Sequence, residues 1–275
     1  MRRAIALLAV CVAIASCSGV AQVDPHRYAE PPRDSITFWG HACVFVDAGG
    51  LGFVTDPVFE KGLWQRRRFI GSPPPEVLQR VRVILLSHAH DDHTSPESLA
   101  LFGDGVTILG PPPAVEFLAK QGIAAKAMRP GDEHVVDGVR FIAVAVHHAG
   151  GRMSVTASAD GDALGWVVVT PAATLFYSGD TDYCSTFSDV GWTYAPDIAI
   201  LNVNGHLMPA DASRAARATR APVVIPAHWG GYGYWVVGGN RHPRGEAQLA
   251  RLLGKRLHVL AVGKSLPLSR PAKEH

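Results

Sequence analysis

Short apolar runs, rich in valine and isoleucine, alternate with turn-forming residues along most of the chain. Runs of about four to eight such residues, bounded by turn signals, are typical of strands that are buried in a sheet. We therefore expect strands at Ile36–Trp39, Cys43–Asp47, Gly52–Thr55, Val81–Leu86, Val106–Leu109, Val139–Val146, Leu164–Thr170, Ala173–Tyr177, Ile198–Val203, Val223–Ile225 and Leu257–Val262.

Helical segments are expected between these runs. Ser95 is a favourable N-cap and Pro96 suits the first position of a helix, so one helix is expected to begin there. Residue types also predict helices over Pro113–Gln121, Asp211–Ala218 and Glu246–Leu253.

The order of these elements predicts the architecture. Strands dominate the early part of the chain and mix with helices later, and no linker or repeat divides the chain after residue 34. We expect one α/β (α+β) domain over residues 35–270. Its layers would form an αββα four-layer sandwich, in which two packed mixed β-sheets carry helices on their outer faces.

The first residues have the pattern of an export signal. A basic start, Arg2-Arg3, precedes an apolar run over residues 4–16 that is shorter than the roughly 20 residues needed to span a membrane. The Ile-Ala-Ser sequence before Cys17 resembles the bacterial lipobox. The hypothesis is therefore a lipoprotein-type signal peptide over residues 1–16, with lipidation of Cys17.

The segment over residues 17–34 is polar and rich in proline near its end, which fits a tether. Ordinary signal cleavage after Ala21 is the alternative to lipidation. We expect an exported protein of the bacterial cell envelope, on the periplasmic side and anchored to a membrane by its N-terminal lipid.

Composition excludes several classes of protein. The chain has 275 residues, of which 47% are hydrophobic and 18% charged, so it is neither disordered, collagen-like nor a coiled coil. The net charge is only +2, which gives no general attraction to nucleic acid. Four cysteines are too few for a disulfide scaffold of this length. The unusual number is 13 histidines, so their clustering is informative.

The densest cluster follows the predicted strand at Val81–Leu86. Residues 88–93 read HAHDDH and offer four potential metal ligands, which are His88, His90, Asp92 and His93. Imidazole and carboxylate groups are ligands for zinc and similar divalent ions. No Cys-x-x-Cys pair is present, so a closed structural zinc site made of thiolates is excluded.

Three later apolar runs also end at potential ligands. Residues 144–146 lead into His147 and His148, residues 175–178 into Asp180, and residues 223–226 into His228. Ligands that follow several strands indicate a metal site at one edge of the sheets.

The HxHxDH motif, a later His, Gly179-Asp180-Thr181 and a final His together resemble the metallo-β-lactamase fold superfamily. Residues 37–42 (TFWGHA) and 55–59 (TDPVF) are similar to one branch of it. That branch holds the N-acyl-phosphatidylethanolamine-hydrolysing phospholipase D and the ascorbate-phosphate lactonase. Residues 67–69 (RRF) resemble the phospholipase side, and residues 202–205 (NVNG) resemble the lactonase side.

The resemblance implies two divalent metal ions per chain, with zinc expected and manganese as the alternative. It implies three ligands for each ion and one bridging carboxylate. These are His88, His90 and His148 for one ion, Asp92, His93 and His228 for the other, and Asp180 between them.

Two further assignments rest on the same resemblance. His148 is preferred to His147 because Arg152 follows it by four residues, a spacing that the branch shows. His41 and Asp56 are expected behind the ligands, where they would orient the imidazoles. The alternative for both is a turn held by local hydrogen bonds.

These residues suggest a metal-dependent hydrolase that uses a hydroxide held by the two metals to cleave an ester-like bond. Asp92 would bind one metal and orient the nucleophile, and His206 would donate a proton. Further candidates for substrate contact are Arg66, Arg67, Arg68, Trp229, Tyr232, Tyr234 and Trp235.

The favoured substrate is a phosphodiester, in a phospholipase D-like reaction. The alternatives are a lactonase or lactone-phosphate hydrolase, a β-lactam hydrolase, and a non-catalytic metal-binding lipoprotein. The expected partners are a small-molecule or lipid substrate and a membrane, and no nucleic acid.

Overall fold

The computed structural model describes most of the chain after the predicted signal. The described residues are 30–59, 71–149, 151, 162–203, 206–228, 236–237, 240–241 and 245–270. The predicted signal peptide and the lipidation site Cys17 lie outside them. None of the helices in the described ranges combines the length and the apolar character needed to cross a membrane.

The first sheet has seven strands. Their bounds are β1 Ser35–Gly40, β2 Cys43–Ala48, β3 Leu51–Thr55, β4 Val81–Leu85, β5 Thr107–Gly110, β6 Lys126–Ala127 and β15 Ser265–Pro267. They are ordered β15-β1-β2-β3-β4-β5-β6. Neighbours are antiparallel from β15 to β3 and parallel from β3 to β6, so the sheet is mixed.

The second sheet has six strands. Their bounds are β7 Glu133–Val136, β8 Val139–Ala145, β9 Leu164–Val169, β10 Thr174–Tyr177, β11 Ile198–Asn202 and β12 Val223–Ala227. They are ordered β12-β11-β10-β9-β8-β7. The pairs from β7 to β10 are antiparallel, and β10, β11 and β12 are parallel. A separate ribbon pairs β13 Val236–Val237 with β14 Asn240–Arg241.

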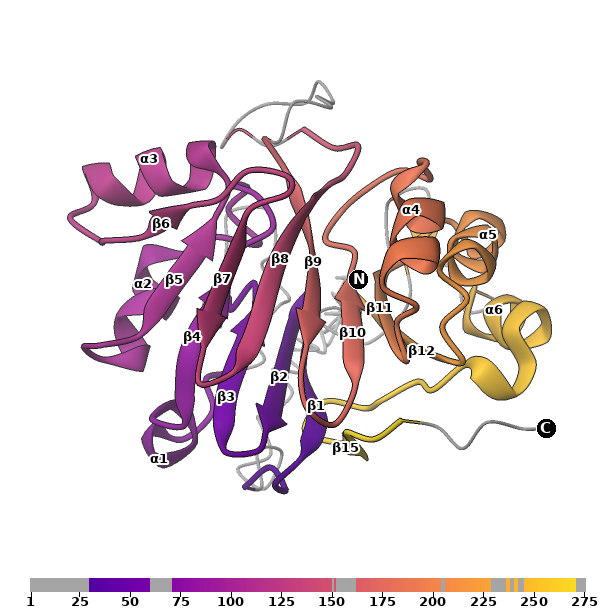
Figure 1. The fold of residues 1–275 in the computed structure, drawn as a ribbon, viewed down its shortest axis with the longest axis horizontal. Helices are drawn as coiled ribbons and strands as arrows, with labels where there is room; N and C mark the ends of the chain where they lie inside the picture. The colour runs from indigo at the N-terminus through magenta and orange to yellow at the C-terminus, as the bar shows by residue number, and fades with distance from the viewer. Residues whose placement is uncertain are drawn as a thin grey trace, which may run out of the picture.

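Two groups of helices cover the outer faces of the sheets. The first group is α1 Pro75–Leu78, α2 Pro96–Leu99 with the 3-10 turn η2 Ala100–Phe102, and α3 Pro112–Lys120. The second group is α4 Thr186–Thr193, α5 Pro209–Thr219, and α6 Gly245–Leu253 with the 3-10 turn η3 Gly254–Arg256. Figure 1 shows the groups on opposite sides of the sheets, the first near β4 to β6 and the second near β11 and β12.

Three apolar clusters fill the spaces between the layers. Successive residues of one strand enter different clusters, because strand side chains alternate between faces. In β3, Phe53 packs between the sheets, where its ring meets Phe141 of β8 edge-on, while Val54 faces the first helical group. In β10, Leu175 faces inward and Phe176 faces the second helical group.

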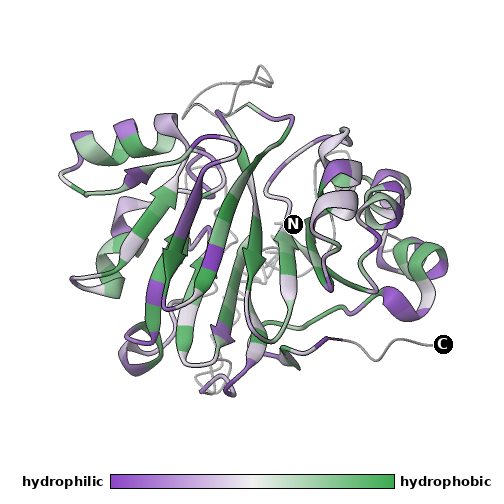
Figure 2. Cartoon of the chain, in the orientation of Figure 1, coloured by the Kyte–Doolittle hydropathy of each residue, from purple (hydrophilic) through white to green (hydrophobic). Residues whose placement is uncertain are grey.

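Both faces of the central strands are therefore apolar, as the green strands in Figure 2 show. This explains the continuous apolar runs in the sequence. The predicted αββα four-layer sandwich with two mixed sheets is confirmed.

The predicted helices are present, with boundaries shifted by one or two residues. Ser95 caps α2, since its side chain accepts a hydrogen bond from the Ser98 N–H at 3.1 Å. The short α1 and the helix α4 were not predicted. The strands β6 and β7 were also missed, because they are short and their side chains are exposed or half-buried.

The strand predicted at Leu257–Val262 is wrong. Leu257 makes only an isolated bridge to Val224, and the residues that follow it have no strand structure. The His258 N–H donates to Val224 in the second sheet, and the Gly263 N–H donates to Phe38 in the first sheet. The segment passes from one sheet to the other, so it cannot continue as a strand of either. The strand that was missed is β15, which pairs with β1.

Asp47 offers a test of stability away from the candidate site. Its buried carboxylate accepts from Arg80 Nη2 at 2.5 Å and from the N–H groups of Asp34 and Gly50. Burial opposes ionisation, but the bonds from Arg80 and the two backbone groups outweigh it and lower the pKa of Asp47.

We expect Asp47→Asn to lower the free energy of unfolding at pH 7 by about 1.5–3 kcal/mol, because it removes a charge-assisted buried bond. A lowered pKa stabilises the fold above about pH 4, and this contribution is lost as the pH falls through the folded-state pKa. Urea unfolding at a series of pH values measures the difference. A difference between wild type and variant that stays constant down to acid pH would contradict this account.

Candidate metal centre

The candidate residues lie at one edge of both sheets because their strands share a direction. In the first sheet β1, β3 and β4 run the same way, and in the second sheet β8, β10, β11 and β12 do. Each residue follows the end of one strand. His41 follows β1, Asp56 follows β3, His88 to His93 follow β4, His148 follows β8, Asp180 follows β10, His206 follows β11 and His228 follows β12.

Three of these residues have a left-handed backbone, which is uncommon outside glycine. The φ angles are 54° at His41, 35° at Asp56 and 66° at His228. The His228 N–H donates to the His41 carbonyl, so the ends of β12 and β1 are joined across the two sheets. Strained backbone of this kind gathers at functional sites, where it directs side chains that an extended strand would turn away.

The loop after β4 is held by contacts with the second sheet. Trp166 Nε1–H on β9 donates to the Leu86 carbonyl at 3.1 Å, and the Leu164 N–H donates to the Ser87 carbonyl at 2.8 Å. Gly179 has a φ of 58°, and a Cβ there would lie 2.7 Å from Ser87 Cβ. Glycine is therefore needed immediately before Asp180, so that the loops after β4 and β10 can meet.

One group of donors consists of His88, His90 and His148, whose ligand atoms all lie within 4.8 Å of one another. His90 Nδ1 is 2.9 Å from His88 Nε2 and 3.4 Å from His148 Nε2. Burial lowers the pKa of His88 well below its usual value and lowers that of His148 to about 3. Both rings are thus neutral at pH 7, which is the form that binds metals.

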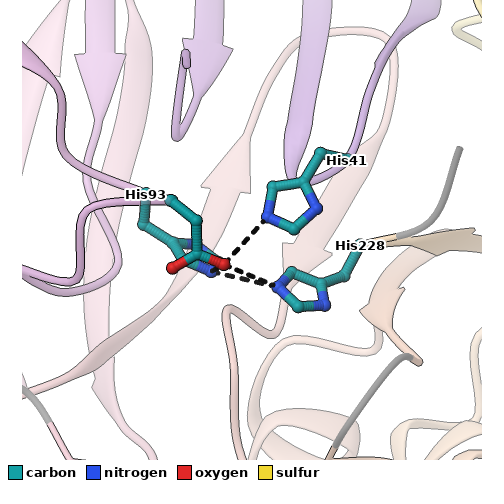
Figure 3. Close-up of side chains that lie close together, drawn as sticks. His41, His93 and His228 are labelled. Carbon is teal, nitrogen blue, oxygen red and sulfur yellow. Dashed lines mark hydrogen bonds and ion pairs between the residues drawn. The ribbon is translucent and has the colours of Figure 1, made fainter. Parts of the chain in front are cut away.

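The second group consists of His41, Asp92, His93 and His228. Asp92 Oδ2 is 3.2 Å from His41 Nε2 and 3.5 Å from the Nε2 atoms of His93 and His228. Figure 3 shows the labelled side chains of His41, His93 and His228 gathered around one point, where the dashed lines converge. Burial opposes ionisation of Asp92, but the neighbouring imidazoles hold its pKa well below the usual value.

Asp180 lies between the two groups. Its Oδ2 is 3.2 Å from His93 Nε2 and 3.3 Å from His228 Nε2. It also forms close sets with His88 and His93 and with His148 and His206. His206 Nε2 is 3.4 Å from Asp180 Oδ2, so the candidate proton donor lies at the same cluster. Burial opposes protonation of His206, but Asp180 raises its pKa above the usual value.

The hydrogen-bond directions show that this cluster fits a cation. Asp56 Oδ2 accepts from Ser87 Oγ at 2.5 Å and lies 2.8 Å from His93 Nδ1. Ser87 Oγ gives its hydrogen to Asp56, so it accepts from His88 Nδ1 at 2.9 Å. In both His88 and His93 the ring hydrogen is therefore on Nδ1, directed at Ser87 or Asp56. The Nε2 atom of each ring keeps an unprotonated lone pair.

At His93 that lone pair faces two carboxylate oxygens, Asp180 Oδ2 at 3.2 Å and Asp92 Oδ2 at 3.5 Å. Acceptors at this spacing repel one another unless a cation or an added proton lies between them. Burial opposes a charge on His93, but Asp180, Asp92 and Asp56 raise its pKa well above the usual value. The site favours positive charge, and its nitrogen and oxygen donors suit a divalent metal.

Comparison with known families agrees with this geometry. The sequence profile described as the beta-lactamase superfamily domain matches residues 52–229, which include all the candidate donors except His41. The chain belongs to the beta-lactamase superfamily.

Several curated relatives of the chain are named UPF0173 metal-dependent hydrolases. The one from Methanoculleus marisnigri is 31% identical over 70% of this chain and 80% of its own length. The one from Methanospirillum hungatei is 28% identical over 70% of this chain and 82% of its own length. The protein is accordingly a metal-dependent hydrolase of this superfamily.

Solved structures of low sequence identity share the fold. A possible metal-dependent hydrolase from Veillonella parvula matches with a TM-score of 0.68 at 17% identity, covering 86% of this chain and 100% of that one. CmlA, a diiron β-hydroxylase from Streptomyces venezuelae, matches with a TM-score of 0.64 at 18% identity, covering 86% of this chain and 55% of its own. Proteins with this fold thus carry out more than one kind of reaction, so the reaction must be inferred from the residues of the site and not from the fold.

The structure brings His148 rather than His147 into the cluster of this superfamily member. The His147 side chain is half exposed and lies 3.6 Å from Asp182, outside the donor groups. His41 was expected behind the ligands, but it lies within the second donor group, because its Nε2 is itself one of the donor atoms. Asp56 lies behind His93, where the sequence predicted it.

Sequence reasoning missed Ser87, Tyr177 and Asn202, which are buried and hydrogen-bonded among the site residues. Ser87 lies in the loop after β4, and its hydroxyl links Asp56 to His88. Several candidates lie outside the described residues. These are Arg66, Arg67, Arg68, Arg152, Asn204, Gly205, Trp229, Tyr232, Tyr234 and Trp235.

Proposed function

We propose that this protein hydrolyses an ester-like bond with two divalent metal ions, zinc in the first place and manganese as the alternative. The observation that carries the proposal is Asp180 Oδ2, which lies between two groups of at least three donors each. His88, His90 and His148 would hold one ion, and Asp92, His93 and His228 the other, with Asp180 shared. When bound, such ions activate water at neutral pH and polarise the bond that is cleaved.

The residues of the chain have separate tasks in this proposal. Asp56 fixes the ring orientation of His93 directly and that of His88 through Ser87. Asp92, whose side chain is 21% exposed, faces the accessible side of the second group and orients the attacking water. His206 is 28% exposed and would deliver a proton to the leaving group.

Among ester-like substrates we favour a phosphodiester. The support is the resemblance of residues 67–69 to the phospholipase side of the branch, together with a lipobox-like Cys17 that would hold the protein at a membrane. The lactone alternative rests on the resemblance of residues 202–205.

Metal analysis and a substrate panel test this function. We expect about two zinc ions per chain by mass spectrometry and turnover of bis(p-nitrophenyl) phosphate and phospholipids. Turnover restricted to lactones or to β-lactams would move the assignment to those classes. Bound metal without turnover of any substrate would favour a non-catalytic metal-binding protein, and iron with redox activity would contradict hydrolysis.

A paired substitution tests the third histidine of the first group. We expect His148→Ala to remove about one metal ion per chain and to lower kcat/KM by at least about 100-fold, because a ligand is lost. His147→Ala is the matched control, since its half-exposed ring lies outside the donor groups. Its kcat/KM should stay within about twofold of wild type. If His147→Ala caused the larger loss, the assignment of His148 would be wrong.

A further inference from the structure

A buried chain of hydrogen bonds lies behind the donor atoms. It involves Tyr177, the last residue of β10, and Asn202, the last residue of β11. The two strands are parallel neighbours, and both side chains are buried. Neither residue belongs to the donor groups, and neither has a task in the reaction proposed above.

The direction of each bond in this chain follows from the groups that make it. The Tyr177 hydroxyl has one hydrogen, which it donates to Asp56 Oδ2 at 2.6 Å. Its oxygen then accepts from Asn202 Nδ2 at 3.2 Å. The same amide nitrogen donates to Asp180 Oδ1 at 2.8 Å, because a carboxylate can only accept.

These bonds leave only one orientation for the Asn202 amide. If the amide were rotated, its oxygen would face two acceptors, the Asp180 carboxylate and the Tyr177 oxygen. In the observed orientation Oδ1 is buried and has no hydrogen-bond partner within the described part of the chain. The amide leaves one acceptor unpaired, and both of its N–H groups are used within this chain of bonds.

The two carboxylates joined by this chain act on different parts of the site. Asn202 holds Asp180 Oδ1, which leaves Oδ2 to face His93 and His228. Asp56 sets the ring of His93 and, through Ser87, that of His88. The positions of donors in both groups therefore depend on Tyr177 and Asn202 as a unit.

We propose that Tyr177 and Asn202 are positioning residues that fix Asp56 and Asp180 relative to each other and so set the spacing of the two donor groups. The inference rests on the proposed function, in which those donors hold two metal ions. Neither residue would touch the substrate, so their effect is exerted through the carboxylates.

The test compares Tyr177→Phe, Asn202→Leu and the double variant with wild type. The matched control is Tyr194→Phe, which removes a hydroxyl at the end of α4 in the outer layer. Two measurements are made on each protein. One is the affinity for Zn²⁺ and Co²⁺ against a competing chelator, together with the visible spectrum of the Co²⁺ form. The other is a crystal structure of the metal-free protein.

We expect each single variant to bind the ions at least about tenfold more weakly and to change the Co²⁺ spectrum, as is usual when groups behind ligands are removed. The double variant should lose about as much metal affinity as either single variant, because both residues act through the same chain of hydrogen bonds. The metal-free crystal structures of both single variants should show a changed separation between the Asp56 and Asp180 carboxylates, because breaking the chain at either residue uncouples the two groups. Tyr194→Phe should match wild type.

The inference is overturned if the variants keep wild-type affinity and spectrum, even with a lowered melting temperature, since that would be a purely structural role. The inference would also be overturned if the fold-losses in metal affinity of the two single variants multiplied in the double variant. Wild-type protein that binds no divalent ion would instead refute the proposed function. The carboxylate positions in the metal-free crystals would then still decide whether Tyr177 and Asn202 position them.

Discussion

Asp180→Ala should abolish turnover and reduce the bound metal from about two ions per chain to one or none. Asp180 Oδ2 lies 3.2 Å from His93 Nε2 and 3.3 Å from His228 Nε2, and the same side chain approaches His88 and His148. A methyl group in its place would leave two sets of nitrogen donors with no shared carboxylate to balance the metal charge. We expect kcat/KM to fall by at least about 1000-fold, which corresponds to about 4 kcal/mol.

The control for this change is Asp182→Ala, two residues further along the chain. The Asp182 side chain is 60% exposed, and within the described ranges its ion-pair contacts are long, 3.6 Å to His147 and 4.0 Å to His206. Its metal content and turnover should remain close to wild type. Metal analysis, steady-state kinetics and circular dichroism on the same preparations distinguish loss of metal from loss of fold. An Asp180→Ala protein that kept two ions and full turnover would refute the dinuclear proposal.

Asp56→Ala should have the largest effect on stability and should also weaken metal binding. The carboxylate is fully buried and accepts from the Ser87 N–H at 2.7 Å, from Ser87 Oγ and from the Tyr177 hydroxyl, while it faces His93 Nδ1. Alanine would remove the acceptor that these buried donors share. We expect the free energy of unfolding to fall by about 3–5 kcal/mol, which lowers the melting temperature by roughly 10 °C.

Metal affinity should fall in the same variant by about 10–100-fold, because the rings of His93 and His88 lose the group that orients them. Calorimetry of the metal-free protein measures the stability, and competition with a chelator measures the affinity. Asp104→Ala, an exposed position in the turn after η2, is the control and should change neither quantity. A stable Asp56→Ala protein with unchanged affinity would show that Asp56 belongs only to a local turn.

The apolar pattern was sufficient to predict most of the fold. Continuous apolar strands with alternating partners, such as Phe53 and Val54, require cover on both faces, and only a layered arrangement provides it. The prediction failed at Leu257–Val262, where an apolar run serves to pass between the two sheets. A run of this kind and a strand have the same pattern, because both bury apolar side chains.

Part of the candidate site could also be predicted from the sequence, and part could not. The density of ligands over residues 88–93 and the residues that end later strands were sufficient to predict His88, His90, Asp92, His93, Asp180 and His228 as one cluster. The choice between His147 and His148 depends on which ring turns inward, and adjacent residues point to opposite sides of an extended backbone. The sequence alone left this choice to a resemblance.

The sequence by itself determined the layered fold and the chemical type of the site, since both follow from residue types at local spacings. Only the tertiary structure showed which buried residues lie behind the metal-binding side chains and hold them in place. Tyr177 lies 121 residues from Asp56 in the chain, and Asn202 lies 22 residues from Asp180, yet hydrogen bonds join each pair. A buried Tyr or Asn at the end of a strand has no local signature. Its partners are chosen by the order and direction of the strands, which bring the ends of β3, β10 and β11 to one edge.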